Sequence, residues 1–150
     1  MGKDNEFKGS ISILGYSPLK FECEFDPKYA PDSVWGDDNT EFVLESSSTS
    51  DRKVHIGELI QFLTYVSTSK NRKQNYYFIL FLCGEADNSP RADLEYKRLK
   101  RYFDNFPMTE TIKSSIAGVY VADQSTVSMK LTKNDLLKMQ AVFVRANKCQ

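Results

Sequence analysis

Alternating apolar and polar residues predict antiparallel strands in the first third of the chain. Phe21, Cys23 and Phe25 alternate with Glu22 and Glu24, which is the period of a strand that buries one face. The predicted strands of this part cover residues 7–14, 19–25, 32–35 and 41–45. Turn-forming residues separate the members of each pair, so the pattern predicts two successive β-hairpins.

Helical and strand patterns alternate from residue 54 onward. Apolar residues at helical spacing predict a helix over residues 54–66, with Ser50 or Asp51 as its N-cap. The unbroken apolar run at 76–83 is typical of a strand that is covered on both faces. A second helix is predicted over 91–106. The side chains expected to face inward from it are Leu94, Leu99, Tyr102, Phe103 and Phe106, and those expected to face outward are Arg98, Lys100 and Arg101.

The C-terminal part adds two strands and a helix. Strands are predicted over 116–121 and 127–131. Thr132 and Asp135 have the spacing of a capping box and predict a final helix that runs to about residue 146.

This order of elements predicts an α/β fold with α+β character. We expect one central mixed sheet, with antiparallel hairpins at its N-terminal side and helices on both faces. The 150 residues have the length of one domain, so we treat 1–150 as a single domain. The chain is 41% hydrophobic, which is enough to bury a core and excludes an intrinsically disordered chain.

Cysteine and histidine usage narrows the classes of site. The three cysteines are an odd number without metal-ligand spacing, which argues against a disulfide framework and a zinc site. The single histidine, His55, argues against most histidine-based catalysis, and we expect it to cap or pack near the start of the first helix. No apolar stretch approaches the roughly 18 residues of a membrane helix, and residues 1–10 lack the apolar run of a signal peptide. We therefore expect a cytoplasmic protein with no membrane partner.

Charge is balanced in total but not along the chain. Residues 1–51 carry four lysines and eleven carboxylates, a net charge of −7, whereas residues 52–150 carry sixteen Lys or Arg and nine carboxylates, a net charge of +7. Two interpretations stay open: an acidic metal-binding half beside a basic half that binds a polyanion, or solvated helix faces without such a role.

Asp32 and Glu45 are the first candidate site residues. If the second hairpin turns between Asp38 and Asn39, opposed residues have numbers that add up to 77, and Asp32 faces Glu45 with Cβ atoms about 4.5–5.5 Å apart. Two carboxylates at that distance repel, so one protonates unless a cation lies between them. Mg²⁺ is the expected ion, because it takes oxygen ligands and its bound water can attack a phosphodiester. The alternative is a pair of exposed acids beside an ordinary turn.

Gln61 and Tyr65 form a second candidate group. They lie four residues apart on one face of the predicted helix, and Glu58 precedes Gln61 by three residues on the same side. We expect this polar strip to face the end of the strand that carries Glu45. Any amphipathic helix also has such polar positions beside its apolar stripe.

Together these motifs resemble the PD-(D/E)xK nuclease superfamily over residues 26–83. Pro31-Asp32 matches the Pro-Asp that opens one strand, Glu45 after an apolar run matches the carboxylate at the end of the next, and Gln61 and Tyr65 match the Gln-x-x-x-Tyr of one branch. The resemblance implies a restriction-endonuclease-like fold and a Mg-dependent endonuclease that acts on nucleic acid, with DNA as the expected partner. It implies Asp32 and Glu45 as metal ligands and leaves a homodimer or a place in a larger complex open.

One residue of the family pattern is missing. The lysine expected two residues after Glu45 is replaced by Ser47, whose hydroxyl cannot offset negative charge in the transition state. Three alternatives follow. Lys53 or Lys70 supplies the missing ammonium; the domain is a catalytically inactive interaction or regulatory module; or the chain is an unrelated α/β domain that binds a small ligand near residues 84–87.

Basic residues gather in two places. Lys70, Arg72 and Lys73 share one predicted loop and are the candidate nucleic-acid-binding residues, because such side chains neutralise backbone phosphates. The second group, on the helix over 91–106, consists of Lys97, Arg98, Lys100 and Arg101. Acidic residues are interleaved with it, so we expect a solvated helix face with local ion pairs there.

Overall fold

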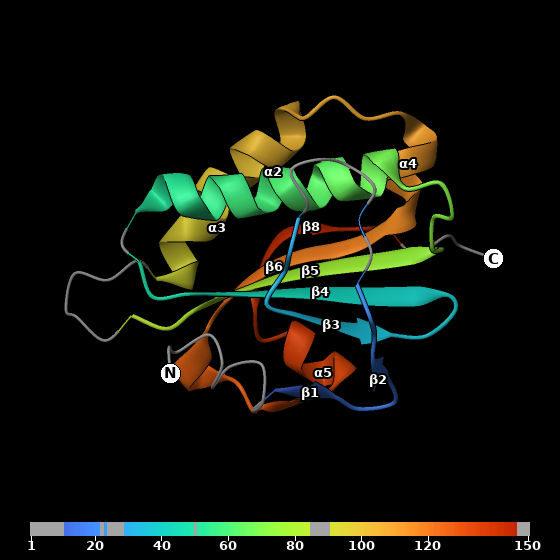
Figure 1. The fold of residues 1–150 in the computed structure, drawn as a ribbon. Coiled ribbons are helices and arrows are strands. Elements are labelled where there is room, and N and C mark those ends of the chain that lie inside the picture. Colours follow the sequence, from blue (N-terminus) through green and yellow to red (C-terminus); the bar gives the residue numbers. More distant parts are fainter. Residues whose placement is uncertain (1–10, 22, 24–28, 50, 85–90, 147–150) are drawn as a thin grey trace.

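A six-stranded mixed sheet forms the centre of the fold, shown in Figure 1 for a computed structural model that describes residues 11–21, 23, 29–49, 51–84 and 91–146. The strand order is β2-β3-β4-β5-β6-β8. These strands are β2 (Ser17–Pro18), β3 (Ser33–Gly36), β4 (Thr40–Ser47), β5 (Asn75–Leu82), β6 (Ile116–Asp123) and β8 (Gln140–Val144). A separate two-stranded parallel pair consists of β1 (Ser12–Ile13) and β7 (Lys130–Leu131). The predicted mixed sheet is confirmed.

Helices cover both faces of the sheet, as predicted (Figure 1). One face carries the long helices α2 (Arg52–Thr68) and α3 (Ala92–Asn105) and the short helix α4 (Glu110–Ser115). The other face carries α5 (Lys133–Leu136) and the β1–β7 pair. The 3-10 turn η1 (Gln124–Thr126) precedes β7 in the chain. The three central strands β4, β5 and β6 are parallel neighbours. The connections from β4 to β5 and from β5 to β6 advance across the sheet in the same direction. Because such crossovers have the same handedness, α2 and α3 lie on the same face.

Two apolar clusters lie on the two faces of the sheet. Under α2 and α3, the cluster includes Val43, Phe78, Leu80 and Val121 of the sheet and Leu59 of α2. On the opposite face, the neighbouring strand positions pack against α5 and the β1–β7 pair; they include Phe42, Leu44, Ile79 and Phe81. Because both faces are covered, β5 is an almost continuous apolar run, which is why its prediction was correct.

Helix α2 has one of the two predicted N-caps, although it begins at Arg52, two residues before the predicted start. The Asp51 side chain accepts a hydrogen bond from the backbone N–H of Lys53, so Asp51 is the N-cap. The buried residues Leu59, Phe62, Leu63 and Val66 form the stripe that holds the helix on the sheet. The cap and the stripe together fix which side chains α2 presents to β4.

The predicted first hairpin is wrong in the described residues. Gly15, at φ +91°, lies in the turn between β1 and β2, and the two strands join different partners. Strand β1 pairs with β7, whereas β2 pairs with β3, so the strands expected over 7–14 and 19–25 do not pair with each other. Residues 19–21 and 23 are not strand, and residues 7–10, 22, 24 and 25 lie outside the described part of the chain.

The predicted final helix is also wrong beyond its first turn. The capping box of Thr132 and Asp135 is present, as predicted, but α5 ends at Leu136. Residues 140–144 instead form β8, which pairs antiparallel with β6 and buries Val142. The β-branched and aromatic residues of this segment suit a strand, and the open edge of β6 supplies its backbone partners. The helix α4, capped by Thr109, was not predicted.

None of the described helices has the length and apolar composition that spanning a bilayer requires.

Candidate active site

Strand β4 carries three polar side chains beneath α2. Glu41, Val43, Glu45 and Ser47 alternate with residues of the opposite face, and all eight residues of β4 are buried. Contacts from α2 reach Glu41 and Ser47 directly, which places this set on the helix-covered face. The helix therefore covers a row of polar groups as well as an apolar core.

The register of the second hairpin is the predicted one. Ser33 pairs with Leu44 and Val34 with Val43, so the numbers of opposed residues add up to 77. Asp32 directly precedes β3, and its charge contributes to the raised pKa of Glu45. Oδ2 of Asp32 accepts a hydrogen bond of 2.8 Å from the backbone N–H of Ser46. The acid pair is thus anchored at the point where β3 begins.

Glu45 is a buried carboxyl with an unusual proton affinity. Its side chain is 5% exposed, and burial raises its pKa to about 9, with further contributions from the negative charges of Asp32 and Glu58. The Tyr29 hydroxyl donates a hydrogen bond of 2.9 Å to Oε1 of Glu45, which lowers the pKa in part. Glu45 is therefore protonated at neutral pH in the absence of a cation.

The acid pair supplies two oxygen-bearing side chains for a metal. Mg²⁺ accepts such a set when waters and substrate phosphates complete its octahedron, so Asp32 and Glu45 fit the ion in part. Within the described ranges, no three His, Cys, Asp or Glu side chains are arranged to hold one ion. Binding of a cation here would also have to displace the proton of Glu45.

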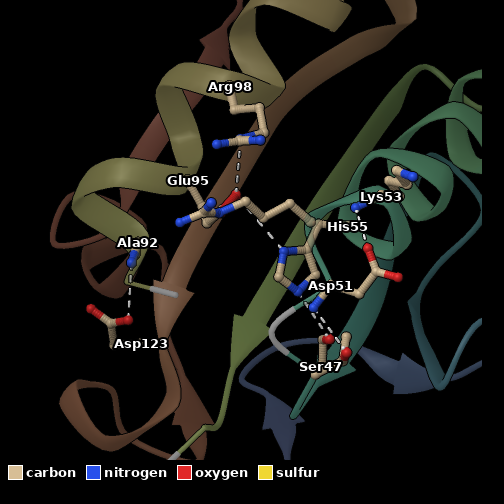
Figure 2. A network of polar contacts seen from close by, with 10 residues as sticks. Ser47, Asp51, Lys53, His55, Ala92, Glu95, Arg98 and Asp123 are labelled. Atoms are coloured by element: carbon tan, nitrogen blue, oxygen red, sulfur yellow. Dashed lines mark hydrogen bonds and ion pairs between the residues drawn. The ribbon is translucent and has the colours of Figure 1, made fainter. Parts of the chain in front are cut away.

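Ser47, at the position of the expected lysine, belongs to a second buried network (Figure 2). Its Oγ lies 3.1 Å from Nε2 of His55, and Nδ1 of His55 lies 3.8 Å from Oε2 of Glu95. Two arginines approach Glu95: Nε of Arg52 lies 3.1 Å from Oε1, and Nε of Arg98 lies 3.7 Å from Oε2. Burial lowers the pKa of His55, whose side chain is fully covered. The network links β4, α2 and α3 and confirms that His55 packs near the start of α2.

The two lysines proposed as substitutes lie at opposite ends of α2. Lys53 is an exposed residue of the first turn, and Lys70 follows the last turn. A helix of 17 residues is about 25 Å long, so these two lysines cannot both serve one acid pair. Glu58, whose charge contributes to the raised pKa of Glu45, lies between Lys53 and Lys70 in the sequence.

The predicted position of the Gln61–Tyr65 strip is wrong. Gln61 is exposed, and the hydroxyl of Tyr65 donates a hydrogen bond of 2.6 Å to Oε1 of Glu41. Because α2 returns along β4 in the opposite direction, its C-terminal half faces the start of that strand and not Glu45. Tyr65 therefore serves Glu41, a residue that the sequence analysis did not select.

The basic loop after α2 is partly engaged with the protein itself. Nε of Arg72 donates to the carbonyl oxygen of Val66, and Nζ of Lys73 donates to that of Asp37. Lys70 lies beside a cavity with Lys20 and Lys73. The loop thus forms a wall of a pocket in addition to a basic surface. Of the small-ligand segment 84–87, only Gly84 lies within the described residues.

Helix α3 buries Leu99 and Phe103 and exposes Arg98, Lys100 and Arg101, as predicted, but two further residues expected inside lie on its surface. The residues that it buries are Ala92, Glu95, Leu99 and Phe103. Leu94 and Tyr102, which were expected inside, are 58% and 44% exposed. These two side chains border a shallow hollow of about 330 Å³, and its other lining residues are Lys97, Arg98 and Arg101. Two apolar side chains thus lie among three cations on the surface.

Several residues of these networks were missed. The alternation in β4 would have placed Glu41 and Ser47 on the face of Glu45, since they are four and two residues away from it. Glu95 occupies the helical stripe of Ala92, Leu99 and Phe103, which is a signal of burial. Tyr29 had no such signal.

Comparison with protein-family models, with curated protein sequences and with solved structures gives no match, so the geometry described above is the basis for a functional proposal.

Proposed function

We propose that this chain is a nucleic-acid-binding domain on a restriction-endonuclease-like scaffold and that it holds the phosphate backbone without hydrolysing it. The observation that carries the binding part is the hollow on α3, where cations and an aromatic ring share one exposed surface. Lysine and arginine neutralise phosphates, and a tyrosine ring offers a base a stacking surface.

The α3 hollow has a geometry suited to a strand of nucleic acid. Lys97 and Arg101 are exposed and one helical turn apart, and Tyr102 follows directly. Arg98 remains close enough to Glu95 for an ion pair while it lines the hollow. The interleaved acids form ion pairs with other cations than Lys97 and Arg101: Glu95 with Arg98, Asp104 with Lys100, and Asp93 with Arg91.

The scaffold part of the proposal rests on the order of the elements. The hairpin β3–β4, the crossover helix α2 and the parallel strand β5 follow one another as in the superfamily that the motifs resemble. Pro31-Asp32 directly precedes β3, and Glu45 lies near the end of β4. This likeness supports the proposal through topology and motif position.

The residue after the acid pair supports the absence of hydrolysis. Ser47 lies at hydrogen-bond distance from His55, at the position where the family has an ammonium group. A hydroxyl next to a neutral imidazole does not offset negative charge on a phosphate as an ammonium group does.

The binding part is tested by fluorescence anisotropy with labelled single-stranded DNA, duplex DNA and RNA over a range of salt concentrations. We expect the double variant Lys97→Gln/Arg101→Gln to weaken binding and to reduce the slope of log K against log salt by about 1.5 to 2. Lys130→Gln is the matched control, because Lys130 is an exposed lysine of β7, outside the α3 hollow. Unchanged affinity in the double variant would reject α3 as the binding surface.

Mg-dependent hydrolysis is the second candidate function, and the opposition of Asp32 and Glu45 favours it. A bound Mg²⁺ would supply an activated water and stabilise charge on the phosphate. The decisive measurements are the shift of the melting temperature with Mg²⁺ or Mn²⁺ and the cleavage of the same oligonucleotides. Metal-dependent cleavage that is lost in Asp32→Asn and in Glu45→Gln would establish this function and refute the non-hydrolytic proposal.

A further inference from the structure

A half-open cavity of about 330 Å³ lies beyond the C-terminal end of α2. Its walls come from three segments that are distant in sequence: the stretch after β2, the start of β4, and the end of α2 with the following loop. Its volume is at the lower end of the range for small-molecule sites. The α3 hollow and this cavity have different lining residues in the described part of the chain, so the two sites can be tested separately.

Positive charge dominates among the described residues that line the cavity. Lys20, Lys70 and Lys73 line it from two of the three segments, and Glu41 is the one carboxyl among the described lining residues. Nζ of Lys73 donates to the Asp37 carbonyl oxygen, which holds this ammonium group in place. A concave site with three ammonium groups attracts an anion, and a phosphate group can take hydrogen bonds from several of them.

Glu41 adds a second kind of contact. Its side chain is 5% exposed, and burial raises its pKa while the nearby Lys73 lowers it. The Tyr65 hydroxyl donates to Oε1, whereas the described residues give Oε2 no hydrogen-bond donor. A buried carboxyl that lines a pocket in this way can bind a hydroxyl or amino group of a ligand.

An apolar wall completes the cavity. Leu19 and Phe21 line it, and the ring of Phe21 lies 4.6 Å from that of Tyr65 and 5.5 Å from that of Tyr29, measured between ring centroids. These ring contacts hold the Phe21 side chain in one orientation. The wall therefore offers a fixed apolar surface to a flat group.

From these three features we infer that the cavity binds a nucleoside monophosphate. The lysines hold the phosphate, Glu41 accepts a hydrogen bond from a ribose hydroxyl or a base amino group, and the base lies against Phe21. The same chemistry is present in a free mononucleotide and in the 5′-phosphorylated end of a nucleic acid strand.

The inference is tested by isothermal titration calorimetry on the full chain with AMP, GMP, CMP and UMP. Adenosine and inorganic phosphate are the two partial ligands, and each should bind at least tenfold more weakly than AMP. A 5′-phosphorylated oligonucleotide of five residues, compared with its 5′-hydroxyl form, distinguishes the two sources. Tighter binding of the phosphorylated strand than of a mononucleotide identifies a strand end, and the reverse order identifies a free nucleotide; both support the site.

Matched variants locate the binding in the cavity. Lys70→Gln and Lys20→Gln should each weaken AMP binding about tenfold, the fold-change expected for the loss of one charge-assisted hydrogen bond. Lys138→Gln, an exposed lysine between α5 and β8, should leave it unchanged. Glu41→Gln keeps an oxygen that accepts from Tyr65 and should weaken AMP while leaving inorganic phosphate unaffected. Equal affinities for AMP and phosphate, or AMP affinity unchanged in both lysine variants, would overturn the inference.

Discussion

Oγ of Ser47 lies 3.1 Å from Nε2 of His55, and both side chains are buried between β4 and α2. On its other side, the imidazole approaches Glu95 of α3. The serine that replaces the expected lysine is therefore part of the contact between the sheet and two helices.

Removal of the imidazole is expected to destabilise the protein strongly. His55→Ala empties a fully buried site and leaves Ser47 and Glu95 without their ring partner, which should cost about 2–4 kcal/mol of the free energy of unfolding. Ser47→Ala removes one hydroxyl and should cost about 1 kcal/mol. Urea unfolding of the three proteins measures this, and equal losses in both variants would contradict a central role of the ring.

Glu45 gives the stability a pH dependence that can be isolated between pH 7 and 9. Its pKa is about 9 in the folded chain against an ordinary value of 4.5, so in this range the folded state retains a proton that the unfolded state has lost. Stability should fall as the pH rises, by at most about 1.4 kcal/mol per pH unit. His55 titrates mainly below this range, because its ordinary pKa is 6.5 and burial lowers the pKa in the folded chain.

Chemical unfolding at several pH values measures this slope. Glu45→Gln should flatten it, since the amide does not titrate. Glu110→Gln, at an exposed position of α4, is the matched control and should keep the slope of the original chain. A slope that survives in Glu45→Gln would assign the proton to another group.

Two glycines should respond in opposite directions to the same substitution. Gly57 lies exposed in the interior of α2, and a Cβ there would meet nothing within 4 Å, so Gly57→Ala should stabilise the chain by about 0.5–1 kcal/mol. At Gly36, a Cβ would overlap the Thr40 carbonyl oxygen and lie 2.9 Å from Cδ1 of Leu19. Gly36→Ala should therefore cost about 2 kcal/mol or more. Thermal unfolding of both variants gives the comparison, and two shifts of the same sign would contradict it.

The face that α3 turns inward is tested by a pair of leucines. Leu99 is fully buried, so Leu99→Ala should cost about 2–5 kcal/mol. Leu94 is 58% exposed, so Leu94→Ala should change stability by less than about 0.5 kcal/mol. Similar losses in urea unfolding would show that the inward face is the one expected from the sequence.

The second hairpin could be predicted because its information is local. A cluster of turn-forming residues fixes the centre, and every later cross-strand pair of β3 and β4 follows from that centre, down to Ser33 and Leu44. The segment at 140–144 shows the opposite case. Its pairing partner β6 lies more than 15 residues earlier in the chain, and a helical pattern was an equally good local solution.

The hydrogen bonds and ion pairs around the acid pair could not be predicted, because they join residues that are far apart in the sequence. Tyr29 and Glu45 are 16 residues apart, and Arg52 and Glu95 are 43 residues apart. The i, i+4 spacing of Gln61 and Tyr65 could not give the part of β4 that Tyr65 faces, nor that Gln61 is exposed. That relation follows from the crossover of α2 over the sheet.

The row of polar groups on β4 has a mechanical consequence for α2. Apolar contacts lose little energy when side chains shift past one another, whereas hydrogen bonds depend strongly on distance and angle. The Tyr65 hydroxyl lies 2.6 Å from the Glu41 carboxyl, and the His55 imidazole lies 3.1 Å from the Ser47 hydroxyl, so both contacts tolerate little displacement. Tyr65 fixes one end of the helix and His55 the other, so a shift by one turn would break both contacts at once. Conformational adjustment to a partner should therefore arise in the connecting segments, while α2 and the sheet move as one rigid body.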